Sequence, residues 1–149
     1  FISQFRSAAT RDLVHTLPPP GHVATFERCR LNHDERATNA TWVAFHRDLL
    51  RLRKQIHTAK IDGAVLGERT FVLRYFAEAD VLIIVNLGVE ARWASCPEPL
   101  MAPPSSARWT LGWSSEDPKY GGAGTAPVDT DDGWHIPGLT TVLLMATSR

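Results

Sequence analysis

The chain has 149 residues, and sixteen Lys and Arg residues balance sixteen Asp and Glu residues, so the formal net charge is zero. This length fits about one domain. The charge balance argues against nonspecific nucleic-acid binding and against a polybasic membrane-surface protein, because both need an excess of cationic side chains. Hydrophobic residues make up 44% and charged residues 21% of the sequence, which is typical of a globular domain and not of a disordered one.

The sequence carries no pattern for export or membrane insertion. Its longest apolar run, 81–85, is far shorter than the ~20 residues that span a bilayer, and no basic region precedes an apolar stretch at the N-terminus. Two cysteines, Cys29 and Cys96, are too few for a disulfide scaffold. We therefore expect a cytoplasmic protein with both thiols reduced. Because the chain begins with Phe1 and not Met, we also expect it to be a fragment of a longer protein.

Residues 1–38 show no regular hydrophobic pattern. Three consecutive prolines, Pro18 to Pro20, block both helix and central strand because they lack N–H donors and restrict φ. We expect an irregular segment over 1–38, mostly a long loop, with a short helix at 1–10.

The clearest helix lies within 39–58. Its apolar residues recur at spacings of three and four, which places them on one face, and Asn39 or Thr41 can cap its first turn. Such a stripe must pack on another element, and Leu49→Ala would cost about 2–5 kcal/mol if that leucine is buried. The stripe consists of Trp42, Phe45, Leu49, Leu52 and Ile56.

From residue 60 onward the pattern is that of short strands separated by Gly, Pro, Asp and Ser. No helical pattern lies between the strands, which favours antiparallel pairing. The predicted fold is mainly β: an antiparallel Greek-key β-sandwich over 60–149, preceded by the amphipathic helix and the irregular N-terminal segment. We expect strands at 70–76, 81–87, 90–95, 108–113, 133–136 and 140–146.

Two of these strands allow a prediction about their faces. In the strand over 81–85, both alternating sets of side chains are apolar. A half-buried strand would alternate apolar and polar residues, so we expect both faces to be covered, one by the second sheet and the other by the helix or by a missing neighbour. In the strand over 108–113, alternation places Trp109, Leu111 and Trp113 on a single face.

Motifs for catalysis or metal binding are weak. The adjacent acids Glu116–Asp117 and Asp131–Asp132 lie in loops, where carboxylates are common turn formers, and a zinc site from His22, Cys29 and His33 lacks a fourth ligand at a typical spacing. The glycine-rich stretch 120–124 lacks the lysine of a phosphate-binding loop. We therefore expect no catalytic residue, no metal and no cofactor in this chain.

Tryptophans are the one candidate for ligand binding. Exposed indole rings can stack on sugars, although core packing is the competing interpretation because aromatic residues dominate cores. The candidates for carbohydrate binding are Trp93, Trp109, Trp113 and Trp134.

Four segments carry a family resemblance. Residues 24–31 (ATFERCRL), 46–53 (HRDLLRLR), 85–88 (VNLG) and 113–122 (WSSEDPKYGG) resemble, in this order, the C-terminal end of α-amylase-superfamily glycoside hydrolases. Among these, the closest resemblance is to the malto-oligosyltrehalose trehalohydrolase family. A serine is usual in that family where Cys29 stands, and the first 20 or so residues match poorly.

The resemblance implies a parent enzyme with a (β/α)8 barrel, whose catalytic carboxylates would all precede Phe1. Residues 1–38 would follow the last barrel strand, 39–58 would be the final barrel helix, and 60–149 would be a C-terminal β-sandwich domain. The parent would hydrolyse the α-1,4 bond next to the trehalose end of maltooligosyl trehalose, in trehalose biosynthesis. This chain would be its noncatalytic portion, with the barrel domain as its partner and the helical stripe packed against it.

Other functions remain open at this point. The chain could be a carbohydrate-binding module that holds a maltooligosaccharide on its tryptophans, or the C-terminal domain of a related branching or debranching enzyme. It could also be an interaction module whose helical stripe docks a partner chain, in which case the isolated fragment would self-associate through Trp42, Phe45 and Leu49. We expect neither a nucleic-acid nor a membrane partner.

Overall fold

A computed structural model describes residues 18–57 and 60–148. The chain divides into two compact units, Phe1–Thr38 and Asn39–Arg149. The first contains two short helices, α2 (Val23–Cys29) and α3 (Glu35–Thr38). The expectation of an irregular segment was therefore wrong for these residues, because the prolines end before α2 begins and the His22 side chain caps it by accepting a 3.2 Å hydrogen bond from the Ala24 N–H. The helix predicted at 1–10 lies outside the described residues.

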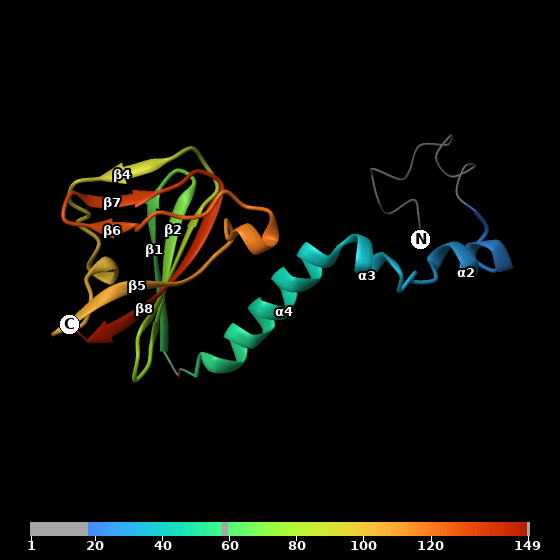
Figure 1. Ribbon diagram of the computed structural model, residues 1–149, viewed down its shortest axis with the longest axis horizontal. Coiled ribbons are helices and arrows are strands. Elements are labelled where there is room, and N and C mark those ends of the chain that lie inside the picture. Colours follow the sequence, from blue (N-terminus) through green and yellow to red (C-terminus); the bar gives the residue numbers. More distant parts are fainter. Residues whose placement is uncertain (1–17, 58–59, 149) are drawn as a thin grey trace. The chain divides into compact units, whose positions relative to one another are not determined.

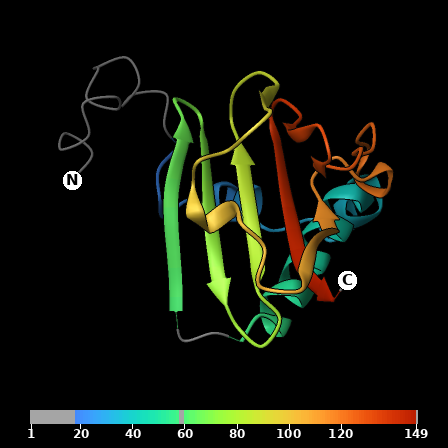
Figure 2. The same cartoon turned by 90° about the vertical axis from the view of Figure 1, so that its left-hand side faces the viewer.

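The second unit contains one long helix, α4 (Ala40–Gln55), and two antiparallel sheets (Figures 1 and 2). This confirms the mainly β fold, a β-sandwich preceded by a helix. The larger sheet has the order β1-β2-β3-β8-β5 and the smaller one β4-β7-β6. After β3 the chain passes to the smaller sheet as β4, returns to the larger one as β5, forms β6 and β7 in the smaller sheet, and ends as β8 between β3 and β5. The strands are β1 (Lys60–Gly67), β2 (Thr70–Phe76), β3 (Val81–Asn86), β4 (Ala91–Trp93), β5 (Ala107–Ser114), β6 (Asp129–Thr130), β7 (Gly133–Ile136) and β8 (Thr140–Ser148).

The predicted strands agree closely with the observed ones. β2 and β7 have the predicted bounds, and β3, β4, β5 and β8 differ from them only at their ends. Two strands were not predicted. β1 includes Asp62, Gly63 and Gly67 and is mostly exposed at the edge of its sheet, so its sequence resembles a loop more than a strand. β6 has only two residues.

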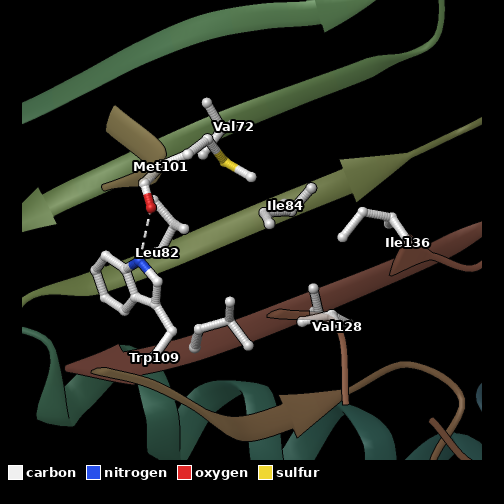
Figure 3. Packing of buried hydrophobic residues seen from close by; sticks show 9 residues of the cluster. Val72, Leu82, Ile84, Met101, Trp109, Val128 and Ile136 are labelled. Atoms are coloured by element: carbon white, nitrogen blue, oxygen red, sulfur yellow. Dashed lines mark hydrogen bonds between the residues drawn. The ribbon is translucent and has the colours of Figure 1, made fainter. Parts of the chain in front are cut away.

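The main hydrophobic core lies between the two sheets (Figure 3). Its tryptophan, Trp109, is 6% exposed and donates a 2.8 Å hydrogen bond from Nε1 to the carbonyl oxygen of Met101, in the short helix η2 (Pro99–Met101). This bond satisfies the polar atom of the buried indole. The core consists of Val72, Leu82, Ile84, Met101, Trp109, Val128, Ile136, Val142 and Leu144.

A second apolar cluster lies on the opposite face of the large sheet. Its buried members are Val81, Trp113 and Leu143, and side chains of α4 pack against them. Strand β3 is therefore covered on both faces, as predicted: Leu82 and Ile84 face the second sheet, and Val81 belongs to the cluster beneath the helix. The alternation of two apolar sets in one strand correctly indicated a three-layer arrangement here.

The prediction that Trp109, Leu111 and Trp113 share one face was wrong. Trp109 lies in the core between the sheets, whereas Trp113 lies in the cluster beneath α4. The cause is a β-bulge at Gly112: Leu111 pairs with Leu144, but Trp113 pairs with the adjacent Leu143. One extra residue in a strand reverses the faces of all residues beyond it.

The buried guanidinium group of Arg74 connects β2 of the large sheet to two neighbouring loops. Arg74 in β2 is 8% exposed, and its Nε and Nη2 atoms donate to Oδ2 of Asp80 at 3.0 and 2.7 Å. Its Nη1 atom donates to the carbonyl oxygens of Leu100 at 3.1 Å and Ala102 at 2.6 Å. The guanidinium thus ties the β2–β3 turn to the segment around η2.

Candidate functional site

One polar site of the described chain joins α4 to the loop that follows β5. The loop contains a short helix, η3 (Pro118–Tyr120). Asp117 caps this helix by accepting a 2.9 Å hydrogen bond from the Lys119 N–H, proline occupies its first position, and Gly121 ends it with a φ of 90°, a conformation that favours glycine. These local features bring Lys119 and Tyr120 to the side of α4.

A chain of hydrogen bonds crosses from the sheet to the helix. Trp113 in β5 donates from Nε1 to the Tyr120 hydroxyl at 2.9 Å, and this hydroxyl donates to Oδ2 of Asp48 in α4 at 2.7 Å. The Nζ atom of Lys119 lies 3.2 Å from the same carboxylate oxygen. A carboxylate that accepts from a hydroxyl and an ammonium group makes a directional link.

The charges at this link stabilise one another. Hydrogen bonds from Tyr120 and Lys119, together with the positive charges of Lys119 and Arg51, lower the pKa of Asp48. Hydrogen bonds to Tyr120 and Asp48, with a contribution from the negative charge of Asp117, raise the pKa of Lys119. Asp48 therefore stays ionised and Lys119 stays protonated at neutral pH, which maintains the attraction between helix and loop.

An aromatic cluster lies directly beside the polar link. The ring of Phe45 in α4 packs 5.4 Å from Trp113 and 5.1 Å from Tyr120 (centroid distances), the latter edge-on. Trp42 lies 6.0 Å from Phe45, also edge-on. Edge-on pairs at these distances add to the stability from buried area alone. Apolar and polar contacts thus converge on the same turns of α4.

This arrangement is suited to holding a helix against the sheet. The candidate acids Glu116 and Asp117 serve the loop: the Glu116 carboxylate accepts from the Ala123 N–H at 3.5 Å, and Asp117 caps η3. Within 18–57 and 60–148, no group of three or more His, Cys, Asp or Glu residues could hold a metal ion. Cys29 is exposed and Cys96 half-buried, and both are free thiols.

The predicted stripe of α4 is placed in part against the sandwich. Phe45, Leu49, Leu52 and Ile56 pack on the cluster of the large sheet, whereas Trp42 is 63% exposed. No residue of α4 is fully buried. Packing of this stripe against a barrel stays a prediction.

The four candidate tryptophans occupy different environments. Trp109 and Trp113 are buried, at 6% and 8% exposure, and both indole N–H groups are bonded within the protein, so neither presents a ring face for stacking. Trp93 and Trp134 are half-buried and lie opposite each other on β4 and β7. They line a depression of about 410 Å³ with Arg92, Asp132 and His135. Sugar binding there stays a prediction.

Reasoning from the sequence did not single out Asp48, Lys119 or Tyr120 as site residues. No periodicity marks them, because two lie in an irregular loop and Asp48 is a charged residue on a mostly apolar stripe. A signal was present, however: Asp48 belongs to segment 46–53 and the other two belong to segment 113–122, both of which carried the family resemblance.

Comparisons with known proteins agree with this placement at a coarse level. Residues 60–131 match the family model described as "Domain of unknown function (DUF3459)", a domain known from the C-terminal region of α-amylase-superfamily enzymes. The match begins at the first residue of β1 and includes η3. Searches of curated proteins and of solved structures returned no match. Among the described helices, none has the length and apolar character needed to cross a bilayer.

Proposed function

We propose that this chain is the noncatalytic C-terminal portion of an α-amylase-superfamily glycoside hydrolase, and specifically of a malto-oligosyltrehalose trehalohydrolase. The parent enzyme hydrolyses the α-1,4 bond next to the trehalose end of maltooligosyl trehalose. In this proposal α4 is the final helix of the catalytic barrel, and the sandwich stabilises the barrel by holding that helix. The location is cytoplasmic, which the free thiols of Cys29 and Cys96 support, because reducing compartments preserve them.

The contact between Asp48 and Tyr120 is the observation that carries the proposal. The family model covers residues 60–131, from β1 to β6 of the sandwich, but not α4. The Tyr120 hydroxyl, inside the matched region, bonds at 2.7 Å to Asp48, outside it. This bond joins residues 46–53 to residues 113–122, and both segments resemble the trehalohydrolase family. The sandwich thus holds α4, the helix that precedes it, through side-chain contacts. This arrangement fits a role at the junction with a catalytic domain.

Product analysis tests the catalytic part of the proposal. We expect the parent enzyme to release trehalose from maltooligosyl trehalose and the isolated 149-residue chain to release no sugar at all. Glucan hydrolysis by the isolated chain would contradict a noncatalytic role. A parent that forms or removes α-1,6 branches without releasing trehalose would instead identify a branching or debranching relative.

A variant of the parent tests the stabilising role. Asp48→Ala removes the acceptor shared by Tyr120 and Lys119, so we expect a lower Tm of the parent with kcat/KM per folded molecule unchanged. Asp132→Ala is the matched control, since Asp132 is exposed on the small sheet side. Equal Tm values for the two variants would argue against the proposal that the contact of Asp48 with Tyr120 and Lys119 stabilises the barrel.

Carbohydrate binding is a second candidate, favoured by the pair Trp93 and Trp134 beside polar side chains in one depression. Titration with maltooligosaccharides while following tryptophan fluorescence tests it. The double variant Trp93→Phe and Trp134→Phe should abolish the change if sugar binds in this depression, whereas a change that persists in this variant would place binding elsewhere. No change at millimolar sugar would exclude the module.

A further inference from the structure

The outer edge of β1 is open to a further strand. In the described part of the chain, β1 is paired with β2 alone, and it forms the left-hand edge of the large sheet in Figure 2. The backbone N–H and C=O groups on the outer side of an edge strand can pair with another chain. Ile61 is 56% and Val65 80% exposed on this strand, so the strand is accessible at both positions.

The other sheet edges of the sandwich carry features that hinder pairing. β4 and β6, the edges of the small sheet, have three and two residues, and very short edge strands offer little to pair with. β5, the other edge of the large sheet, contains the bulge at Gly112, which bends the strand and interrupts pairing. β1 has eight residues, and its register with β2 is regular from Lys60 to Val65. β1 is therefore the one long, regular edge among the described strands.

A second copy of this chain fits the β1 edge, because the sequence of the strand complements itself. When two copies pair antiparallel about a two-fold axis, one residue of the strand must lie opposite its own counterpart. Centring on Asp62 would place two carboxylates opposite each other, which destabilises a sheet. Centring on Ala64 would place Ile61 and Val65 each opposite a glycine. Centring nearer either end would leave part of the strand unpaired.

Centring on Gly63 brings the exposed apolar side chains together. Ile61 and Val65 lie two residues before and two residues after this glycine, so each would face the other across the pair, twice in the dimer. A glycine inside a strand often marks the close approach of another backbone. A side chain at Gly63 would come within 2.9 Å of the Cδ2 atom of Leu73 in β2, so Leu73 extends over the glycine and would add to the apolar contact at the axis.

We propose that two copies of this chain pair through β1, antiparallel and centred on Gly63, and so join their five-stranded sheets into one. Each copy contributes the same edge, which closes the assembly at a dimer. Backbone hydrogen bonds supply the affinity and alternate side chains supply the register, as in other cases of strand addition. One strand per copy is a smaller interface than the ~800 Å² per partner of a stable complex, so the dimer should dissociate on dilution. The pairing uses the sandwich alone and does not depend on the identity of the parent enzyme.

Disulfide trapping tests the register. Cys29→Ser and Cys96→Ser first remove the native thiols, and Ile61→Cys and Val65→Cys are then prepared as separate variants. Opposite residues have Cα atoms about 4.5–5.5 Å apart, within disulfide range, whereas two copies of the same one of these residues would lie about 14 Å apart. We expect mild oxidation to link the mixed variants at least about tenfold faster than either variant alone, with intact mass identifying the mixed disulfide. Links within one variant that form as fast as the mixed ones would overturn the proposed pairing.

Sedimentation equilibrium tests the dimer without any new cysteine. We expect the unmodified chain to pass from monomer to dimer between micromolar and millimolar concentration, and Val65→Lys to remain monomeric, because lysine on an edge strand opposes pairing. Val89→Lys is the matched control and should dimerise like the wild type, since Val89 is 87% exposed in the loop after β3. A monomer at every concentration would overturn the inference. A dimer that persists in Val65→Lys would also overturn it, and loss in Trp42→Ala alone would then assign the contact to α4.

Discussion

The Tyr120 hydroxyl donates a 2.7 Å hydrogen bond to the Asp48 carboxylate across 72 residues of sequence. The same hydroxyl accepts a hydrogen bond from Nε1 of Trp113. With both roles of the hydroxyl used, the orientation of the tyrosine is fixed relative to the sheet on one side and to α4 on the other. The position of the helix on the sandwich therefore depends strongly on this one side chain.

Tyr120→Phe should loosen α4 while keeping the aromatic cluster. Loss of the hydroxyl leaves the Trp113 indole N–H without its acceptor, and we expect the free energy of unfolding to fall by about 1 kcal/mol or more. Chemical denaturation measures it. Tyr75→Phe is the control on the same sheet face, because the Tyr75 hydroxyl makes no hydrogen bond within the described chain. Equal effects of the two variants would contradict the proposed link.

The free energy of unfolding should decrease at acid pH, because Asp48 becomes protonated there. Its pKa is lowered below the ordinary 3.8 in the folded state, so ionised Asp48 favours folding at any pH above the unfolded value. This contribution is lost as pH falls from about 3.8 through the folded pKa. We expect the difference in stability between the wild type and Asp48→Asn to be constant at neutral pH and to shrink below pH 4. A difference that is independent of pH down to 2 would contradict this.

Alanine substitutions at different positions of α4 should lower the free energy of unfolding by very different amounts. Phe45 packs on Trp113 and Tyr120, so Phe45→Ala should destabilise by about 2–3 kcal/mol. Leu49 is only half-buried, and we expect about 1–2 kcal/mol for Leu49→Ala, less than the 2–5 kcal/mol for full burial. Leu50, at 57% exposure, is the matched control and should change stability by under about 0.5 kcal/mol. The reverse order for Leu49 and Leu50 would mean that the helix packs on its other face.

The two arginine ion pairs of the sandwich should contribute very differently. Arg74→Met leaves the side chain of Asp80, 12% exposed, without its partner, and breaking a buried pair in this way typically costs about 3–5 kcal/mol. Arg92 pairs with Glu90 at the surface, where both side chains are largely exposed, so Arg92→Met should cost about 0–1 kcal/mol. Thermal unfolding of both variants measures the difference. Similar losses of stability in the two variants would show that burial does not strengthen the contribution of the Arg74 ion pair.

Much of the fold could be predicted because it follows from local patterns. The spacing of Phe45, Leu49 and Ile56 identified α4, and the doubly apolar strand over 81–85 indicated layers on both of its faces. Local patterns failed where a single residue changes the register. Gly112 adds one residue to β5. A glycine inside a strand often marks a bulge, but the alternation of Trp109, Leu111 and Trp113 favoured a regular strand.

The sequence alone determined α4, six of the strands and the apolar faces of α4 and β3, because hydrogen-bonding period and side-chain polarity act over a few residues. Only the tertiary structure decided which distant groups meet: that Tyr120 reaches Asp48, that Arg74 lies buried beside Asp80, and that Trp109 and Trp113 belong to different cores. Such pairs depend on strand register and on how a loop folds back on its sheet. Both are settled by the packing of the whole domain, which no short stretch of residues contains.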